Sequence, residues 1–190
     1  ASVLGIALGV TALITVVSVM NGFEKELRAR ILGMISHATI AGVGTGLGEG
    51  EWHAAMDEAA KDARVLGSAP YIEREAMLQG QQVAGAIIRG IDPATEVTVS
   101  EIADDIKHGR LADLRPGEFG IVLGQELAWV LGAQVGDKIT VYAPEVRATP
   151  VGALPTLRSF KVVAVFEAGM QEYDRSLAMI HLQDAQRLYR

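Results

Sequence analysis

Residues 1–23 contain no charged side chain, and nearly every position from 3 to 20 is apolar. As an α-helix, a run of this length extends about 34 Å, enough to cross a hydrocarbon core of about 30 Å. A cleaved signal peptide is the alternative, but such peptides begin with basic residues and have a shorter apolar centre. The run therefore predicts a transmembrane helix over residues 1–23, truncated at its N-terminus.

A stalk helix is expected to follow over residues 24–36, because the helical pattern continues past the apolar run. Phe23, Leu27, Ile31 and Met34 recur at near four-residue spacing, which places them on one face of a helix. Such a stripe packs either on the chain's own domain or on the stalk of a partner subunit, and both alternatives stay open at this point.

The rest of the chain predicts a mixed domain of helices and strands. Gly67 and Gly80 follow periodic segments as expected of a helix end and a hairpin turn, and Asp184 precedes the last periodic segment as a helix N-cap would. The expected elements are a strand at 38–43, helices at 51–66 and 98–107, strands at 69–79 and 82–91, a strand–helix–strand unit over 120–142, strands at 160–166 and 177–182, and a final helix.

Charge and composition exclude several classes of function. The net charge is −6 with acidic and basic residues interspersed, so there is no basic stripe for nucleic acid. The glycines of residues 42–50 match neither a dinucleotide-binding nor a phosphate-binding loop. No acid–base constellation can be identified and no cofactor is expected, so we expect a non-catalytic protein. A metal site is not expected either, because the histidines are scattered: His37, His53, His108 and His181.

One long segment is unusual for a connection between strands. Residues 143–159 exceed the usual hairpin loop of about two to five residues. Pro144, Pro150 and Pro155 oppose regular pairing, yet the segment also carries the apolar Val151 and Leu154. Apolar residues in a long loop are costly to expose unless the parent domain or a partner covers them. The alternatives are therefore a disordered loop and a stiff docking loop over residues 144–155.

Several motifs resemble one family of membrane permeases. Met20-Asn-Gly-Phe-Glu24, within the apolar helix and stalk, strongly resembles the LolC/LolE lipoprotein-releasing ABC-transporter permeases. The segments 123–128 and 135–138 are shared more widely with MacB-type permeases. The resemblance covers essentially the whole chain.

This resemblance implies a role for the proline-rich loop. In the LolC branch a protruding hook captures the periplasmic carrier LolA, and residues 149–160 are similar to its distal arm. Arg158 matches a basic position at the base of the hook that contacts the carrier. The implied carrier-binding residues are Pro144, Pro150, Val151, Gly152, Ala153, Leu154, Pro155 and Arg158.

The resemblance also implies the architecture. An α+β fold is expected, with the transmembrane helix and stalk followed by a MacB-like periplasmic domain. A Porter lobe would comprise residues 37–79 and 160–190, and a β-rich Sabre lobe, residues 80–159, would be inserted between its parts. Further periplasmic residues and further membrane helices are expected after Arg190.

The function implied is that of a permease subunit of an ATP-driven, lipoprotein-releasing complex of the Gram-negative inner membrane, with its soluble domain in the periplasm. Expected partners are LolA, a separate LolD-like ATPase, a LolE-like or other second permease subunit and the lipoprotein substrate. LolF, a hybrid subunit, fits as well as LolC. A MacB-like efflux permease and an FtsX-like signalling permease are the rival hypotheses.

Overall fold

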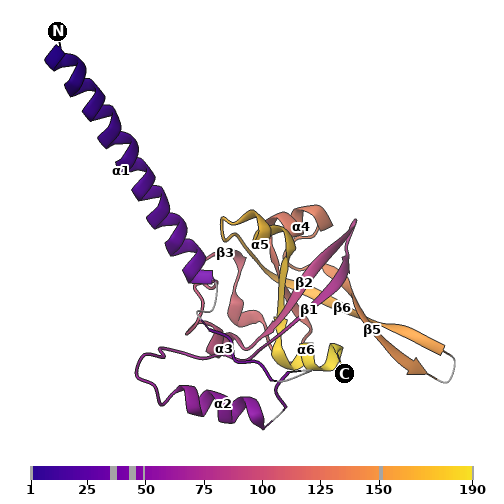
Figure 1. The fold of residues 1–190 in the computed structure, drawn as a ribbon. Coiled ribbons are helices and arrows are strands. Elements are labelled where there is room, and N and C mark those ends of the chain that lie inside the picture. Colours follow the sequence, from indigo (N-terminus) through magenta and orange to yellow (C-terminus); the bar gives the residue numbers. More distant parts are fainter. Residues whose placement is uncertain (1, 35–37, 43–45, 49, 150–151, 190) are drawn as a thin grey trace. The chain divides into compact units, whose positions relative to one another are not determined.

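The computed structural model describes residues 2–34, 38–42, 46–48, 50–149 and 152–189 (Figure 1). The chain divides into two compact units, Ala1–His37 and Ala38–Arg190. The first unit is a single helix, and the second contains the sheet and the remaining helices.

Helix α1 covers Ser2–Met34, so the apolar run and the predicted stalk up to Met34 lie on one continuous helix, and residues 35–36 of the expected stalk lie outside the described residues. Its segment Val3–Glu26 contains an 18-residue stretch with a mean hydropathy of 2.4 and no buried residue, so by length and composition the segment can cross a membrane. Two hydroxyls on this segment are satisfied within the helix. Thr11 Oγ1 donates to the Ala7 carbonyl oxygen and Thr15 Oγ1 donates to the Thr11 carbonyl oxygen, each at 2.8 Å. These two hydroxyl groups can therefore enter lipid without being left unpaired.

The second unit is a mixed sheet whose strands close on themselves. The strand order is β3-β6-β4-β7-β2-β1-β5, and β5 also pairs with β6, so all strands except β3 form a barrel. The strands are β1 (Tyr71–Gln79), β2 (Val83–Ile91), β3 (Ile106–Gly109), β4 (Gly120–Gly124), β5 (Lys138–Thr149), β6 (Gly152–Phe166) and β7 (Leu177–His181).

Short helices connect the strands and cover the two ends of the barrel. Helices α4 and α5 lie at one end and α6 at the other (Figure 1). The helical segments are α2 (Glu51–Ala59), α3 (Pro93–Glu96), the 3-10 turn η1 (Leu111–Asp113), α4 (Gln125–Leu131), α5 (Gln171–Ser176) and α6 (Leu182–Leu188).

The hydrophobic core fills the barrel, because alternate residues of each strand point inwards. Leu78, Ile88, Ile121, Val141 and Ile180 are each fully buried. Both end helices contribute to the same core, α4 through Leu127 and Leu131 and α6 through Ala185 and Leu188. The β5–β6 pair closes the ring. Near the barrel, β5 is therefore held between β6 and β1, and β6 is held between β5 and β4.

Several predicted elements are confirmed. The hairpin around Gly80 is present as β1 and β2, and the strand–helix–strand unit is present as β4, α4 and β5. Gly132, which ends α4, has a φ of 62°, the left-handed conformation expected of a glycine that ends a helix.

Three expectations were wrong. Residues 38–42 form no strand, and the helix expected at 98–107 does not form. Turns occupy that segment up to residue 105, and strand β3 begins at Ile106. Helix α2 ends at Ala59, earlier than expected. The backbone N–H of Arg64 donates instead to the Asp62 carboxylate at 3.0 Å, a local bond that competes with helix continuation.

Candidate partner-binding site

The segment expected to be a long loop is instead a two-stranded arm. Strands β5 and β6 stay paired from Ala143↔Thr156 to Thr149↔Gly152. The pairing of β1 with β5 ends at Tyr142, and β4 and β3 pair with β6 only from Lys161 onwards. Among the described residues, the outer part of β5 and β6 therefore has no third strand. The arm projects from the barrel in Figure 1.

The expectation that prolines would prevent pairing was wrong. Pro144 lies where the register shifts between Ala143 and Val146, and Pro155 pairs opposite Val146. A proline is tolerated at a bulge or on an edge strand, since it interrupts no inner ladder there. A two-stranded arm has only edge strands, so it can accommodate both residues.

The predicted hook residues fall into three groups. Pro144 lies in β5 with an exposed side chain, and Arg158 is exposed near the base of β6. Pro150 and Val151 lie outside the described residues. Four others lie in the outer part of β6, where only the backbone is described: Gly152, Ala153, Leu154 and Pro155.

Arg158 has an aromatic contact at the base of the arm. Its guanidinium carbon lies 4.5 Å from the centre of the Phe119 ring, within the range of a cation–π interaction. The Phe119 ring in turn meets the buried Phe160 ring edge to face, with centroids 5.6 Å apart. Within the described part of the chain Arg158 has no carboxylate partner, so its N–H groups stay available to an acceptor.

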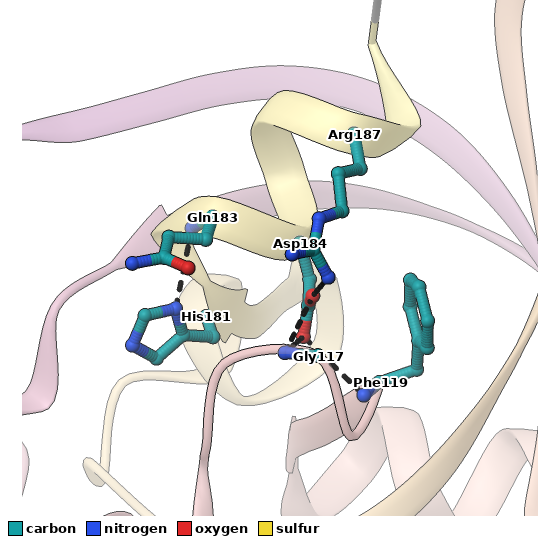
Figure 2. A network of polar contacts seen from close by, with 6 residues as sticks. All are labelled: Gly117, Phe119, His181, Gln183, Asp184 and Arg187. Atoms are coloured by element: carbon teal, nitrogen blue, oxygen red, sulfur yellow. Dashed lines mark hydrogen bonds and ion pairs between the residues drawn. The ribbon is translucent and has the colours of Figure 1, made fainter.

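A buried carboxylate holds the turn that carries Phe119. The backbone N–H of Gly117 donates to Asp184 Oδ1 at 2.9 Å, and that of Phe119 donates to Oδ2 at 3.3 Å. Figure 2 shows the Asp184 side chain pointing from α6 towards this turn. Asp184 is fully buried, and Arg187 Nη1 lies 3.4 Å from Oδ1. Helix α6 is thereby tied to the loop before β4.

Asp184 was expected to be the N-cap of the last helix, and that expectation was wrong. His181 is the N-cap, and its Nδ1 accepts a hydrogen bond from the Gln183 backbone N–H at 3.2 Å (Figure 2). Asp184 lies inside the first turn of α6, and its carboxylate accepts hydrogen bonds from the loop before β4 instead. Sequence reasoning missed Phe119 altogether, because nothing in the local pattern indicates its contact with Arg158.

The predicted stalk residues lie on α1, in the other unit of the chain. The Phe23 side chain is 64% exposed, which is typical of an apolar helix face that contacts lipid or another protein. The side chains of Leu27, Ile31 and Met34 lie outside the described part, although their backbone is helical.

The described residues bring together no cluster of metal ligands. No group of three or more His, Asp or Glu side chains among them could hold a metal ion. One buried carboxyl, Glu96, has a pKa raised by burial, with the nearby Arg89 opposing the rise. Arg89 Nη2 lies 3.8 Å from Glu96 Oε1, so the two side chains form a buried ion pair.

Comparisons with known proteins agree with the motifs. The sequence matches the MacB-like periplasmic core domain family over residues 1–190. It is 47% identical to the lipoprotein-releasing system transmembrane protein LolC of Xylella fastidiosa (strain Temecula1), across 100% of this chain and 46% of that protein. Identity to LolC of Neisseria meningitidis serogroup B is 45%, over 100% of the chain and 45% of the relative.

A relative from the other branch is also similar. The lipoprotein-releasing system transmembrane protein LolE of Haemophilus influenzae is 30% identical over 97% of this chain and 45% of its own length. The chain thus spans about half the length of the curated relatives it matches.

Proposed function

Because the chain belongs to the MacB-like periplasmic core domain family, we propose that it forms part of a permease subunit that releases lipoproteins from the bacterial inner membrane. The proposal is supported by whole-chain similarity to proteins named as lipoprotein-releasing LolC. Helix α1 would anchor the subunit in the inner membrane, and the barrel unit would work in the periplasm.

The observation that carries the proposal furthest is the two-stranded arm. We propose that residues 144–155 are a hook that binds the periplasmic carrier LolA. Paired strands without a third neighbour lose less conformational entropy on docking than a disordered loop would, because the backbone is already ordered. Burying Val151 and Leu154 against a partner would contribute about 1.5–3 kcal/mol each before entropic losses.

Arg158 would provide the electrostatic part of the same contact. Its exposed guanidinium lies at the base of the arm and faces no acidic group in the described structure. A planar guanidinium can bind a carboxylate through two parallel hydrogen bonds. It would therefore fix the orientation of a carrier that the apolar tip captures.

Energy for release would come from another subunit. A separate LolD-like ATPase would move the membrane helices, and the stalk stripe of Phe23, Leu27, Ile31 and Met34 would pass this motion to the periplasmic domain. A LolE-like or second identical subunit would complete the path of the lipoprotein. This chain would act mechanically, without cofactor or chemical step.

Two rival functions predict different partners. A MacB-like efflux permease would bind a periplasmic adaptor, and an FtsX-like permease would bind an activator of a cell-wall hydrolase. Neither needs a hook for a lipoprotein carrier. Identity is 47% with LolC of Xylella fastidiosa, but in Haemophilus influenzae it is 30% with LolE and 29% with LolC, so the LolC-like role rests on the arm. A LolF-like hybrid is compatible with the same arm.

A binding measurement with purified LolA tests the hook. The chain would be placed in lipid nanodiscs and immobilised, and its Kd for LolA measured with and without Pro150→Ser, Leu154→Ser and Arg158→Gln combined. We expect binding at least about tenfold weaker in the triple variant, since anchoring residues dominate the affinity of protein interfaces.

The control variant keeps the fold and removes an exposed aromatic side chain on α4, outside the arm. Trp129 on α4 is 83% exposed, and Trp129→Ala should leave the Kd unchanged. Equal binding by the triple variant and the original chain would remove the hook assignment.

A further inference from the structure

Phe119 has an unusual backbone conformation. Its φ of 52° is the only positive value among the non-glycine residues that the structure describes. A bulky side chain is rarely found in this left-handed region, because its Cβ crowds the backbone. Such strain persists only where surrounding contacts determine the conformation, and it is commonly found at functional positions.

The surrounding contacts are concentrated on this one turn. Asp184, on α6, accepts hydrogen bonds from the N–H groups of Gly117 and Phe119. The Phe119 carbonyl oxygen accepts from the Lys161 N–H of β6 at 2.9 Å. The backbone of Phe119 is therefore held on one side by α6 and on the other by the strand that forms the arm.

The ring that this backbone directs lies against a residue of the arm's base. The Phe119 ring supports the Arg158 guanidinium at 4.5 Å and is itself backed by Phe160. An exposed arginine normally samples many rotamers, and ordering it on binding costs conformational entropy. Stacking on a fixed ring reduces the number of positions from which its N–H groups can reach a partner.

We propose that Phe119 and Asp184 are positioning residues for Arg158. Asp184 fixes the turn, the turn fixes the ring, and the ring holds the guanidinium where the base of the arm meets its partner. This inference rests on the proposed function, in which Arg158 contacts the carrier. It adds that the carrier-binding surface depends on α6, a helix distant from the arm in sequence.

The simpler alternative is that Phe119 only fills the end of the barrel. An apolar residue of similar size would then serve equally well, and Arg158 would not respond to its replacement. The two explanations differ in what Phe119→Leu does to Arg158, and this difference can be measured without any partner.

The first experiment is NMR spectroscopy of the arginine-labelled full chain in nanodiscs. The Arg158 side-chain protons should be shifted upfield by the Phe119 ring current. The shift should persist in Phe119→Tyr, disappear in Phe119→Leu, and diminish in Asp184→Asn, where one N–H of the turn faces an amide NH₂ group. Arg158 signals that are unshifted in the folded original chain would overturn the proposal.

The second experiment is a double-mutant cycle on LolA binding. Phe119→Leu should weaken binding about two- to fivefold, the range for an exposed cation–π contact. In an Arg158→Gln background the same replacement should have little further effect. Effects that simply multiply would show that Phe119 acts independently of Arg158, against the proposal. Trp129→Ala again serves as the folded control.

The two experiments separate this inference from the proposed function. If the original chain does not bind LolA, the proposed function fails, and the NMR comparison still decides whether Phe119 positions Arg158. If LolA binds but the Arg158 signals do not respond to Phe119, the positioning role fails alone.

Discussion

The guanidinium of Arg89 lies 3.8 Å from the Glu96 carboxylate in an almost dry part of the interior. The two side chains retain only 14% and 3% of their exposure, and Arg89 also lies over the Tyr71 ring, 4.7 Å from its centre. Arg89 Nε and Glu96 Oε2 have no hydrogen-bond partner in the described structure. The attraction therefore compensates only partly for the removal of both charges from water.

The first prediction concerns pH. Burial raises the pKa of Glu96 above its ordinary value of 4.5. The folded state then holds this proton more tightly than the unfolded state, so Glu96 makes the protein less stable as pH rises from 4.5 through the folded pKa. Glu96→Gln, which stays neutral, should reduce this part of the pH dependence of Tm. A Glu96→Gln chain with an unchanged pH profile and a much lower Tm at pH 7 would contradict it.

The second prediction concerns the other member of the pair. Arg89→Met should destabilise the domain at pH 7 by about 3 kcal/mol, because it leaves a buried carboxylate without its counter-charge. Chemical denaturation followed by circular dichroism measures this change. Combining Arg89→Met with Glu96→Gln should restore most of the loss, and a double variant as unstable as Arg89→Met would rule out the charge as the cause.

The third prediction concerns the tie between α6 and the loop before β4. Asp184→Ala should lower the free energy of unfolding by about 3 kcal/mol, since it removes the acceptor for two N–H groups of the turn. Arg187→Ala is the matched control. Its side chain is 51% exposed and makes a longer contact with Asp184, so we expect a loss below about 1 kcal/mol. Equal losses in the two variants would argue against the turn as the main role of Asp184.

The fourth prediction uses two glycines of one strand. A Cβ added at Gly90 would lie 2.4 Å from the Ala185 Cβ of α6, whereas one added at Gly85 would meet no atom within 4 Å. Gly90→Ala should therefore displace α6 and destabilise the domain by about 1–3 kcal/mol. Gly85→Ala should be neutral or stabilising by up to about 1 kcal/mol. Thermal melts of both variants check the contrast, which would fail if the two melted alike.

The fifth prediction separates the arm from the fold. Replacing residues 144–155 by Asn-Gly would connect Ala143 to Thr156 through a two-residue turn, and these residues already face each other in the register that such a turn requires. The barrel should keep its Tm within a few degrees because the outer arm pairs only with itself, while LolA binding should be lost. Unfolding of the shortened chain would show instead that the arm supports the barrel.

Sequence reasoning worked where local pattern and tertiary environment agree. The uncharged run of α1 and the strand pattern around Gly80 are both properties of a short window. The position of Gly132 was equally readable, because only glycine adopts its backbone conformation without strain.

Sequence reasoning failed where contacts between segments far apart in the chain determine the local structure. The arm was expected to be a loop because prolines count against pairing, yet β5 and β6 need to pair only with each other there. Strand β3 forms because β6 offers it an edge, which no window around residues 106–109 reveals. The contact between Phe119 and Arg158 joins two segments that β4, α4 and β5 separate in the chain, and a positive φ at phenylalanine has no sequence signal.

The β5–β6 pair is both the closing seam of the barrel and the root of the arm. A force on the arm is therefore resisted by a ladder that continues, past the register shift at Pro144, into the wall of the domain. Peeling the arm away would have to unzip that wall before the arm could swing freely. A partner that pulls on the arm would therefore move the barrel together with it, because the arm and the barrel share the same two strands.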